Sequence, residues 1–169
     1  MKLHIGGKQA KEGWKILNIQ KKDNVDFVGD ISDLSQFESK SINEIYASHV
    51  LEHVSQKKAL STLEGVYRVL KKEGKFYVSV PDMDILAHTF VNPLGTSQVK
   101  FHVMRMMFGG QVDENDFHFF GWNFIFLRDY LTKAGFSKIS RVNSFGLFED
   151  TSDYKPYGFL ISLNVIATK

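Results

Sequence analysis

The stretch Ile45-Tyr46-Ala47-Ser48-His49-Val50-Leu51-Glu52-His53-Val54 decides how this chain folds. Residues 44–47 are short and apolar enough for a buried strand, and Ser48 is a typical helix-capping residue at the turn that follows. We expect a strand that turns into a helix after Ser48, with His49 and His53 one helical turn apart. Because ligands bind beyond the carboxyl ends of the strands in open α/β sheets, this polar turn is a candidate site.

The chain after this turn has the pattern of a helix followed by a strand. Apolar residues recur at spacings of three and four from residue 50 to residue 70, which is typical of a helix face packed on a sheet. Lys71-Lys72-Glu73-Gly74 is expected to end the helix, because lysines suit the negative end of the helix dipole and glycine suits a left-handed cap. Residues 75–80 are the clearest predicted strand, and Pro81-Asp82 follows as a polar turn.

The remaining elements extend this pattern in both directions. The early strands are joined by connections too long for hairpins, which predicts parallel pairing. We therefore predict an α/β fold, a Rossmann-like three-layer sandwich with a mostly parallel seven-stranded sheet whose last strand is antiparallel. The further predicted strands are residues 3–5, 14–19, 25–28, 44–47, 136–142 and 159–167, and the further predicted helices are residues 82–90, 98–108 and 126–134.

Composition favours a single globular domain over 1–169 and excludes several function classes. The formal net charge is +2 and the lysines and arginines are scattered, so we expect no nucleic-acid partner. No apolar run reaches the roughly 20 residues that span a bilayer, and residues 1–7 lack the apolar core of a signal peptide. The chain has no cysteine. We therefore expect a cytoplasmic protein with no membrane partner and no disulfides.

Two motifs together carry a resemblance to a known family. His49-Val50-Leu51-Glu52-His53 follows one strand, and Arg68-Val69-Leu70-Lys71-Lys72-Glu73-Gly74 precedes another. With the glycine turn after the first strand, this order resembles the class I S-adenosylmethionine-dependent methyltransferases, in a small subgroup with a His-x-Leu-Glu-His turn. The resemblance covers about residues 3–82 and implies the Rossmann-like methyltransferase fold, with S-adenosylmethionine as the cofactor.

The resemblance assigns the first part of a cofactor site. Gly6, Gly7 and Lys8 correspond to the glycine-rich turn beside the methionine part of the cofactor. Asn18 and Ile19 fall at the end of the second strand, where the family has an acid that binds the ribose hydroxyls. Lys8 replaces a glycine and Asn18 replaces a carboxylate, and both departures favour an alternative function, a noncatalytic binding module that keeps the fold.

The resemblance also assigns the rest of the cofactor site. Asp30 matches the acid that faces the adenine amino group, with the Ile31 backbone beside the ring. Ser48 and His49 are expected on the floor of the site near the transferable methyl group.

Methyl transfer requires the protein to position an acceptor and sometimes to remove its proton. His49 is the first candidate base, since an ordinary imidazole titrates near neutral pH; the alternative is a capping or backbone-bonding role. Residues 83–123 form an insertion that we expect to act as an acceptor lid, with His118 as a second candidate base and Trp122 as an aromatic wall. The alternative is that the aromatic residues there simply pack under a surface loop.

The resemblance implies a small-molecule or sugar-like acceptor, with oxygen as the acceptor atom. The aromatic middle of the chain leaves a homodimer open. His49-Val50-Leu51-Glu52-His53 also fits His-x-x-Glu-His, an inverted zinc-peptidase motif in which two histidines bind the metal. Asp113, Glu114, Asp116 or His118 would then supply a third ligand. Because the five-residue match is short, we predict no metal site.

Overall fold

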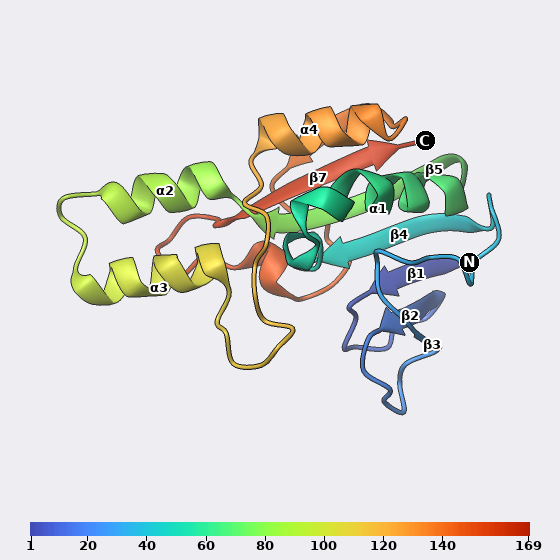
Figure 1. The fold of residues 1–169 in the computed structure, drawn as a ribbon, viewed down its shortest axis with the longest axis horizontal. Helices are drawn as coiled ribbons and strands as arrows, with labels where there is room; N and C mark the ends of the chain where they lie inside the picture. Colours follow the sequence, from blue (N-terminus) through green and yellow to red (C-terminus); the bar gives the residue numbers. More distant parts are fainter.

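Seven strands form one sheet in the order β3-β2-β1-β4-β5-β7-β6 in the computed structural model, which describes residues 1–169 (Figure 1). β7 runs antiparallel to both its neighbours, β5 and β6, and every other pair is parallel. The predicted mostly parallel sheet with an antiparallel last strand is confirmed. The strands are β1 Lys2–Ile5, β2 Trp14–Asn18, β3 Phe27–Val28, β4 Ile42–Ser48, β5 Leu70–Pro81, β6 Ser137–Val142 and β7 Ser162–Thr168.

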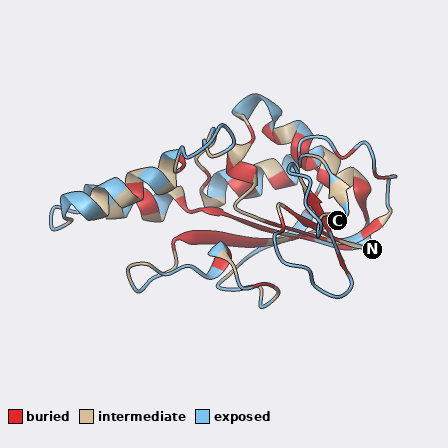
Figure 2. Cartoon of the chain, turned by 90° about the horizontal axis from the view of Figure 1, so that it is seen from below, coloured by how far each residue is buried: buried red, intermediate tan, exposed pale blue.

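Helices α1, Gln56–Val69, and α4, Phe124–Lys133, cover one face of this sheet (Figures 1 and 2). In α1 the buried residues Ala59, Leu63 and Val66 follow the spacing of four and three that places them on one helix face. These residues pack with the apolar side chains of the sheet and of α4 in a single cluster of 27 buried residues. The main core therefore lies between the sheet and these two helices.

The other face of the sheet is covered by residues 143–161, which contain only the short 3-10 helix η2, Thr151–Asp153. Phe148 of this segment packs with Trp14 and Tyr46 in a second cluster. The connection from β1 to β2 is only residues 6–13, too short for a crossover helix. The predicted sandwich thus has helices in one outer layer and a connecting segment in the other.

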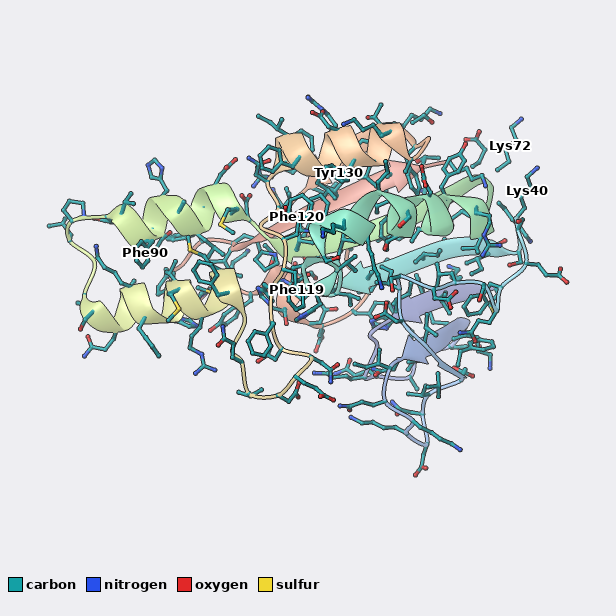
Figure 3. The ribbon with its side chains drawn as sticks, viewed as in Figure 1. Lys40, Lys72, Phe90, Phe119, Phe120 and Tyr130 are labelled. Carbon is teal, nitrogen blue, oxygen red and sulfur yellow. The ribbon has the colours of Figure 1, made fainter.

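Helices α2, Met83–Val91, and α3, Ser97–Phe108, form a hairpin that projects from the edge where β5 ends (Figure 1). Phe90 lies in the outer part of this hairpin, whereas Lys40 and Lys72 lie at the opposite end of the molecule (Figure 3). A third small cluster of Leu86, Val103 and Ile161 fastens the hairpin to the segment before β7. None of the helices has the length and hydrophobicity needed to cross a membrane.

The helix predicted directly after Ser48 begins later than expected. Residues Leu51–His53 form a separate 3-10 turn, η1, and Val54 is extended before α1 starts at Gln56. The predicted single helix with His49 and His53 one turn apart is therefore wrong. His49 lies before η1, and His53 is the last residue of η1.

The end of α1 also differs from the prediction. The helix ends at Val69, and the lysines of the Lys71-Lys72 pair belong to β5. Glu73, with φ of 60°, takes the left-handed conformation predicted for Gly74. Gly74 is needed for a different reason, since a Cβ there would lie only 2.8 Å from the carbonyl oxygen of Lys71.

Candidate functional site

A cleft of about 590 Å³ opens at the carboxyl ends of β1, β2, β3 and β4. β1 has β2 on one side and β4 on the other, so the order of the strands reverses at this point. Such a reversal is where parallel α/β sheets hold their ligands. Of the predicted site residues, the cleft is lined by Gly6, Lys8, Asn18, Ile19, Asp30, Ile31, Ser48 and His49.

The glycine turn after β1 forms part of the cleft floor. Gly6 has φ of +74°, and a Cβ there would lie 2.6 Å from Val50 Cγ2. A Cβ on Gly7 would lie 2.7 Å from Cγ of the His4 ring, and Gly7 itself does not line the cleft. Gly6 therefore shapes the floor directly, and Gly7 leaves room for the His4 ring.

Asn18 holds this turn from the neighbouring strand. Its amide Nδ2 donates to the carbonyl oxygen of Gly7 at 3.2 Å, and its Oδ1 accepts from the backbone N–H of Gln20 at 2.9 Å. Both ends of the amide are thus engaged by the backbone. Ile19 beside it is 45% exposed, so its side chain offers an apolar surface at the cleft.

Asp30 also lines the cleft, shortly after β3. Its Oδ1 accepts from the backbone N–H of Ser32 at 2.7 Å, and no protein group bonds Oδ2. The side chain is exposed at the cleft, whereas Ile31 is 1% exposed and packs into the main core. Asp30 therefore has one carboxylate oxygen free for a ligand, in a loop anchored by its neighbour.

Ser48 at the end of β4 belongs to a polar network that sequence analysis missed. Asp150 Oδ1 accepts from Ser48 Oγ at 3.1 Å, and Asp150 Oδ2 accepts from the hydroxyl of Tyr46 at 2.8 Å. Asp150 also caps η2 through the backbone N–H of Ser152. Burial raises the pKa of the Tyr46 hydroxyl, and the negative charge of Asp150 adds to this effect.

His4 contributes an aromatic ring to the same part of the cleft. The ring packs against Phe148 with centroids 4.1 Å apart and edge-on against Tyr46 at 5.0 Å. Burial lowers the pKa of His4 to about 4, although the negative charge of Asp150 acts in the opposite direction. His4 is therefore a neutral ring at neutral pH, and its Nδ1 has no hydrogen-bond partner.

His49 lines the cleft with φ of 53°, a left-handed conformation that non-glycine residues seldom adopt. Its Nε2 lies 2.9 Å from Ser162 Oγ, and its Nδ1 lies 3.2 Å from Glu52 Oε1. Because the Ser162 hydroxyl donates to the carbonyl oxygen of Thr151, Ser162 Oγ accepts from His49 Nε2. Nε2 is thus held by Ser162, and Nδ1 faces the Glu52 carboxylate.

Three further titratable side chains form a cluster next to His49. Glu52 is 1% exposed, and His53 and His118 are partly buried, with their rings edge-to-face at 4.9 Å. His53 Nδ1 lies 3.0 Å from the carbonyl oxygen of Phe117, and His118 Nδ1 lies 3.0 Å from that of Met106. Burial lowers the pKa of His118, while the charge of Glu52 raises it.

This arrangement decides two of the predictions made from sequence. His49 and His53 do not form the pair of metal ligands that an inverted zinc-peptidase motif requires, because both nitrogens of His49 are engaged elsewhere. His118 does not line the cleft and faces His53 instead, so the structure does not bring it together with His49 as a second base.

The segment after α3 contributes three residues to the lining of the cleft, namely Glu114, Asn115 and Phe119. Phe119 and Phe120 diverge, and Phe120 packs against Tyr130 of α4 (Figure 3). Trp122 is 1% exposed and stacks on Phe120, so the prediction of an aromatic wall for the acceptor at this residue is wrong. Phe119, which is 57% exposed, is the aromatic side chain at the cleft.

Several lining residues come from segments whose position the sequence did not reveal. They belong to the β1–β2 and β2–β3 connections and to the segment before η2, which has no periodic pattern. The only sequence signal for the last group is Asp150-Thr151-Ser152, a capping pattern without a following helix of ordinary length. The lining residues outside the predicted site and lid are His4, Ile5, Gln9, Gln20, Lys22, Gly29, Val50, His53, Phe148, Glu149, Asp150 and Thr151.

A family model described as a methyltransferase domain matches residues 8–78. This part of the chain, 71 of its 169 residues, is similar to that family. This match confirms the resemblance that the sequence motifs indicated, and it spans the strands β2 to β4, helix α1 and most of β5. A search of curated protein sequences finds no match.

Solved methyltransferase structures share the fold over almost the whole chain. A S-adenosylmethionine-dependent methyltransferase from Archaeoglobus fulgidus is 15% identical with a TM-score of 0.60, covering 99% of this chain and 85% of its own. A methyltransferase from Thermotoga maritima is 16% identical with a TM-score of 0.61, covering 99% and 81%. The 1,6-didemethyltoxoflavin-N1-methyltransferase of Burkholderia thailandensis, solved with its substrate and S-adenosylhomocysteine, is 14% identical with a TM-score of 0.62, covering 99% and 70%. These likenesses establish the class I methyltransferase fold.

Proposed function

We propose that the chain binds S-adenosylmethionine in the cleft at the carboxyl ends of β1 to β4 and transfers its methyl group to a small-molecule acceptor. The observation that carries the proposal is the position of the cleft, at the reversal of strand order within a methyltransferase domain. A structural neighbour binds S-adenosylhomocysteine and a small heterocyclic substrate, which supports the same class of ligands for this chain.

The cleft offers groups of suitable charge for each part of this cofactor. Lys8 and Lys22 line it and supply positive charge for the methionine carboxylate. The free Oδ2 of Asp30 accepts a hydrogen bond from the adenine amino group, Ile19 offers an apolar contact beside the base, and the Ile31 backbone lies beside the ring. The cofactor would thus lie across the ends of β1, β2 and β3.

His49 is the proposed proton acceptor for an oxygen nucleophile. Glu52 holds its Nδ1, as a carboxylate orients a catalytic imidazole, and this leaves Nε2 to act. Nε2 donates to Ser162 Oγ at 2.9 Å, so it can accept a proton only after the Ser162 hydroxyl turns away and the ring proton lies on Nδ1 beside Glu52. The lid of residues 83–123 would close over the acceptor through Glu114, Asn115 and Phe119.

A noncatalytic binding module is the second candidate, and Asn18 favours it. Ribose hydroxyls are usually held by a carboxylate here, but both polar ends of the Asn18 amide bond the backbone of Gly7 and Gln20. A module of this kind would bind the cofactor or a related nucleoside without turnover.

Calorimetric titration with S-adenosylhomocysteine, followed by an acceptor screen with radiolabelled cofactor, tests the proposal and separates the two candidates. We expect 1:1 binding and methyl incorporation that falls by about 100-fold or more in His49→Gln, the ordinary contribution of a general base. Binding without incorporation into any acceptor would support the module, and the absence of binding would contradict both.

A further inference from the structure

We propose that Glu52, His53 and His118 form a binding site for a divalent transition-metal ion such as Zn²⁺, behind the wall of the cleft. One ligand atom from each of the three side chains lies within 4.8 Å of the others. A tetrahedral ion with bonds of about 2.1 Å holds its ligands about 3.4 Å apart, so small side-chain rotations suffice to bring the three onto an ion.

Both histidines have the hydrogen bonds that metal-ligating histidines usually have. Nδ1 of His53 is bonded to the carbonyl oxygen of Phe117, and Nδ1 of His118 is bonded to that of Met106. A carbonyl oxygen accepts only, so the proton lies on Nδ1 of each ring and Nε2 carries the lone pair. A backbone carbonyl in this role fixes the tautomer and the orientation of a metal-bound imidazole.

The buried carboxylate of Glu52 is not explained by packing of the cluster alone. Its carboxylate is buried at 1% exposure; Oε1 lies 3.2 Å from His49 Nδ1, and neither oxygen has a hydrogen-bond partner. A buried carboxylate oxygen left unpaired is costly, and a cation removes that cost. The positive charge expected at this place is that of an ion held between Glu52 and the two histidines.

The chemistry of the donor set selects the class of ion. Two imidazole nitrogens and one carboxylate oxygen suit Zn²⁺ and similar transition metals, whereas Mg²⁺ and Ca²⁺ prefer oxygen ligands alone. Three protein ligands leave at least one position open for water or for an oxygen atom of a ligand. His53 itself lines the cleft, so a ligand in the cleft is close enough to reach this position.

The site joins segments that are distant in sequence. Glu52 and His53 belong to η1, and His118 belongs to the segment that follows α3. The backbone N–H of Phe119 donates to the carbonyl oxygen of Glu52 at 2.8 Å, so the two segments are already fastened beside the site. A bound ion would join the segment that follows α3 to η1, which follows β4.

The test uses the full chain without an affinity tag, stripped of metal by a chelator. Zn²⁺ is titrated in competition with a chromogenic chelator, and Co²⁺ is added to a second sample to record its visible absorption bands. We expect one Zn²⁺ per chain and Co²⁺ bands typical of low-coordinate nitrogen and oxygen ligation. Binding of Zn²⁺ should weaken by about 100-fold or more in His118→Gln, since even changes in outer partners of metal ligands cost 10–100-fold.

His88→Gln is the matched control, because His88 is an exposed histidine in α2 outside the cluster. It should bind Zn²⁺ like the parent chain. If His118→Gln fails to fold by circular dichroism, His53→Gln and the rise in melting temperature of the parent chain on adding Zn²⁺ provide the same comparison. No binding at one equivalent, or equal binding by the parent chain, His118→Gln and His53→Gln, would overturn the inference.

Titration of the same samples with S-adenosylhomocysteine separates this inference from the proposed function. His118 does not line the cleft, so His118→Gln should bind the cofactor product with the parent affinity. Loss of Zn²⁺ binding with retained S-adenosylhomocysteine binding supports the metal site. Zn²⁺ binding without S-adenosylhomocysteine binding in the parent chain would contradict the proposed function alone.

Discussion

Replacing Gly6 by alanine should damage the floor of the cleft in a way that can be divided into two parts. The first part is conformational, because φ of +74° costs an alanine about 1–2 kcal/mol. The second part is steric, because the new Cβ would lie 2.6 Å from Val50 Cγ2, and overpacking of this kind costs about 1–3 kcal/mol. We expect Gly6→Ala to lower the free energy of unfolding by about 2–5 kcal/mol in total.

Gly13→Ala is the matched control. Gly13 has φ of +77°, nearly the same as Gly6, and nothing lies within 4 Å of the position of its Cβ. Its substitution should therefore cost only the conformational part, about 1–2 kcal/mol. Urea unfolding followed by circular dichroism measures both values, and calorimetry with S-adenosylhomocysteine reports whether the floor has moved.

A double-mutant cycle with Val50→Ala isolates the steric part. Val50→Ala removes Cγ2, so Gly6→Ala in that background should cost no more than Gly13→Ala costs in the parent chain. If Gly6→Ala cost the same with valine or alanine at position 50, the contact between Gly6 and Val50 would not limit the floor, and our account of this glycine would be refuted.

Three further substitutions test other parts of the site. Asp30→Ala should weaken binding of S-adenosylhomocysteine by about 10- to 100-fold in calorimetry, the value of one hydrogen bond to a charged group, and an unchanged affinity would place the adenine elsewhere. His4→Phe should flatten the dependence of stability on pH. The pKa of His4 is about 4 in the folded chain against 6.5 in the unfolded chain. The stability that depends on a neutral His4 is therefore fully present above pH 6.5 and is lost as the pH falls to 4. The parent chain should therefore lose about 3 kcal/mol more than His4→Phe between pH 7 and pH 4 in urea unfolding, and parallel losses would contradict the burial of a neutral imidazole. Asp150→Ala should cost about 2–3 kcal/mol in the same assay, because the buried hydroxyl of Tyr46 loses its charged partner, and a cost below 1 kcal/mol would show that Ser152 replaces it.

The strands could be predicted from sequence because their signals are local. Residues 75–80 and the alternating apolar residues of β7 needed only their own periodicity, and the connections between the early strands, too long for hairpins, then indicated parallel pairing. The cleft-lining residues Gly6, Asp30 and Ser48 could be placed because each lies at or just beyond the end of a strand, and the carboxyl ends of parallel strands meet at one edge.

The errors came from residues whose positions depend on distant contacts. His49 is held by Ser162 and Glu52 in a left-handed conformation, and no helical periodicity contains that information. Trp122 was placed at the cleft because it follows a polar loop, but stacking on Phe120 turns it into the core. Asp150 was missed because its partners are about 100 residues earlier in the chain.

The central claim is that the cleft at the carboxyl ends of β1 to β4 holds S-adenosylmethionine, and calorimetric titration of the metal-free chain with S-adenosylhomocysteine tests it most directly. We predict 1:1 binding with a micromolar dissociation constant that weakens in Asp30→Ala and is unchanged in Asp129→Ala, a substitution on the exposed surface of α4. No binding at millimolar concentration of the ligand, or binding that is the same in all three proteins, would contradict the claim.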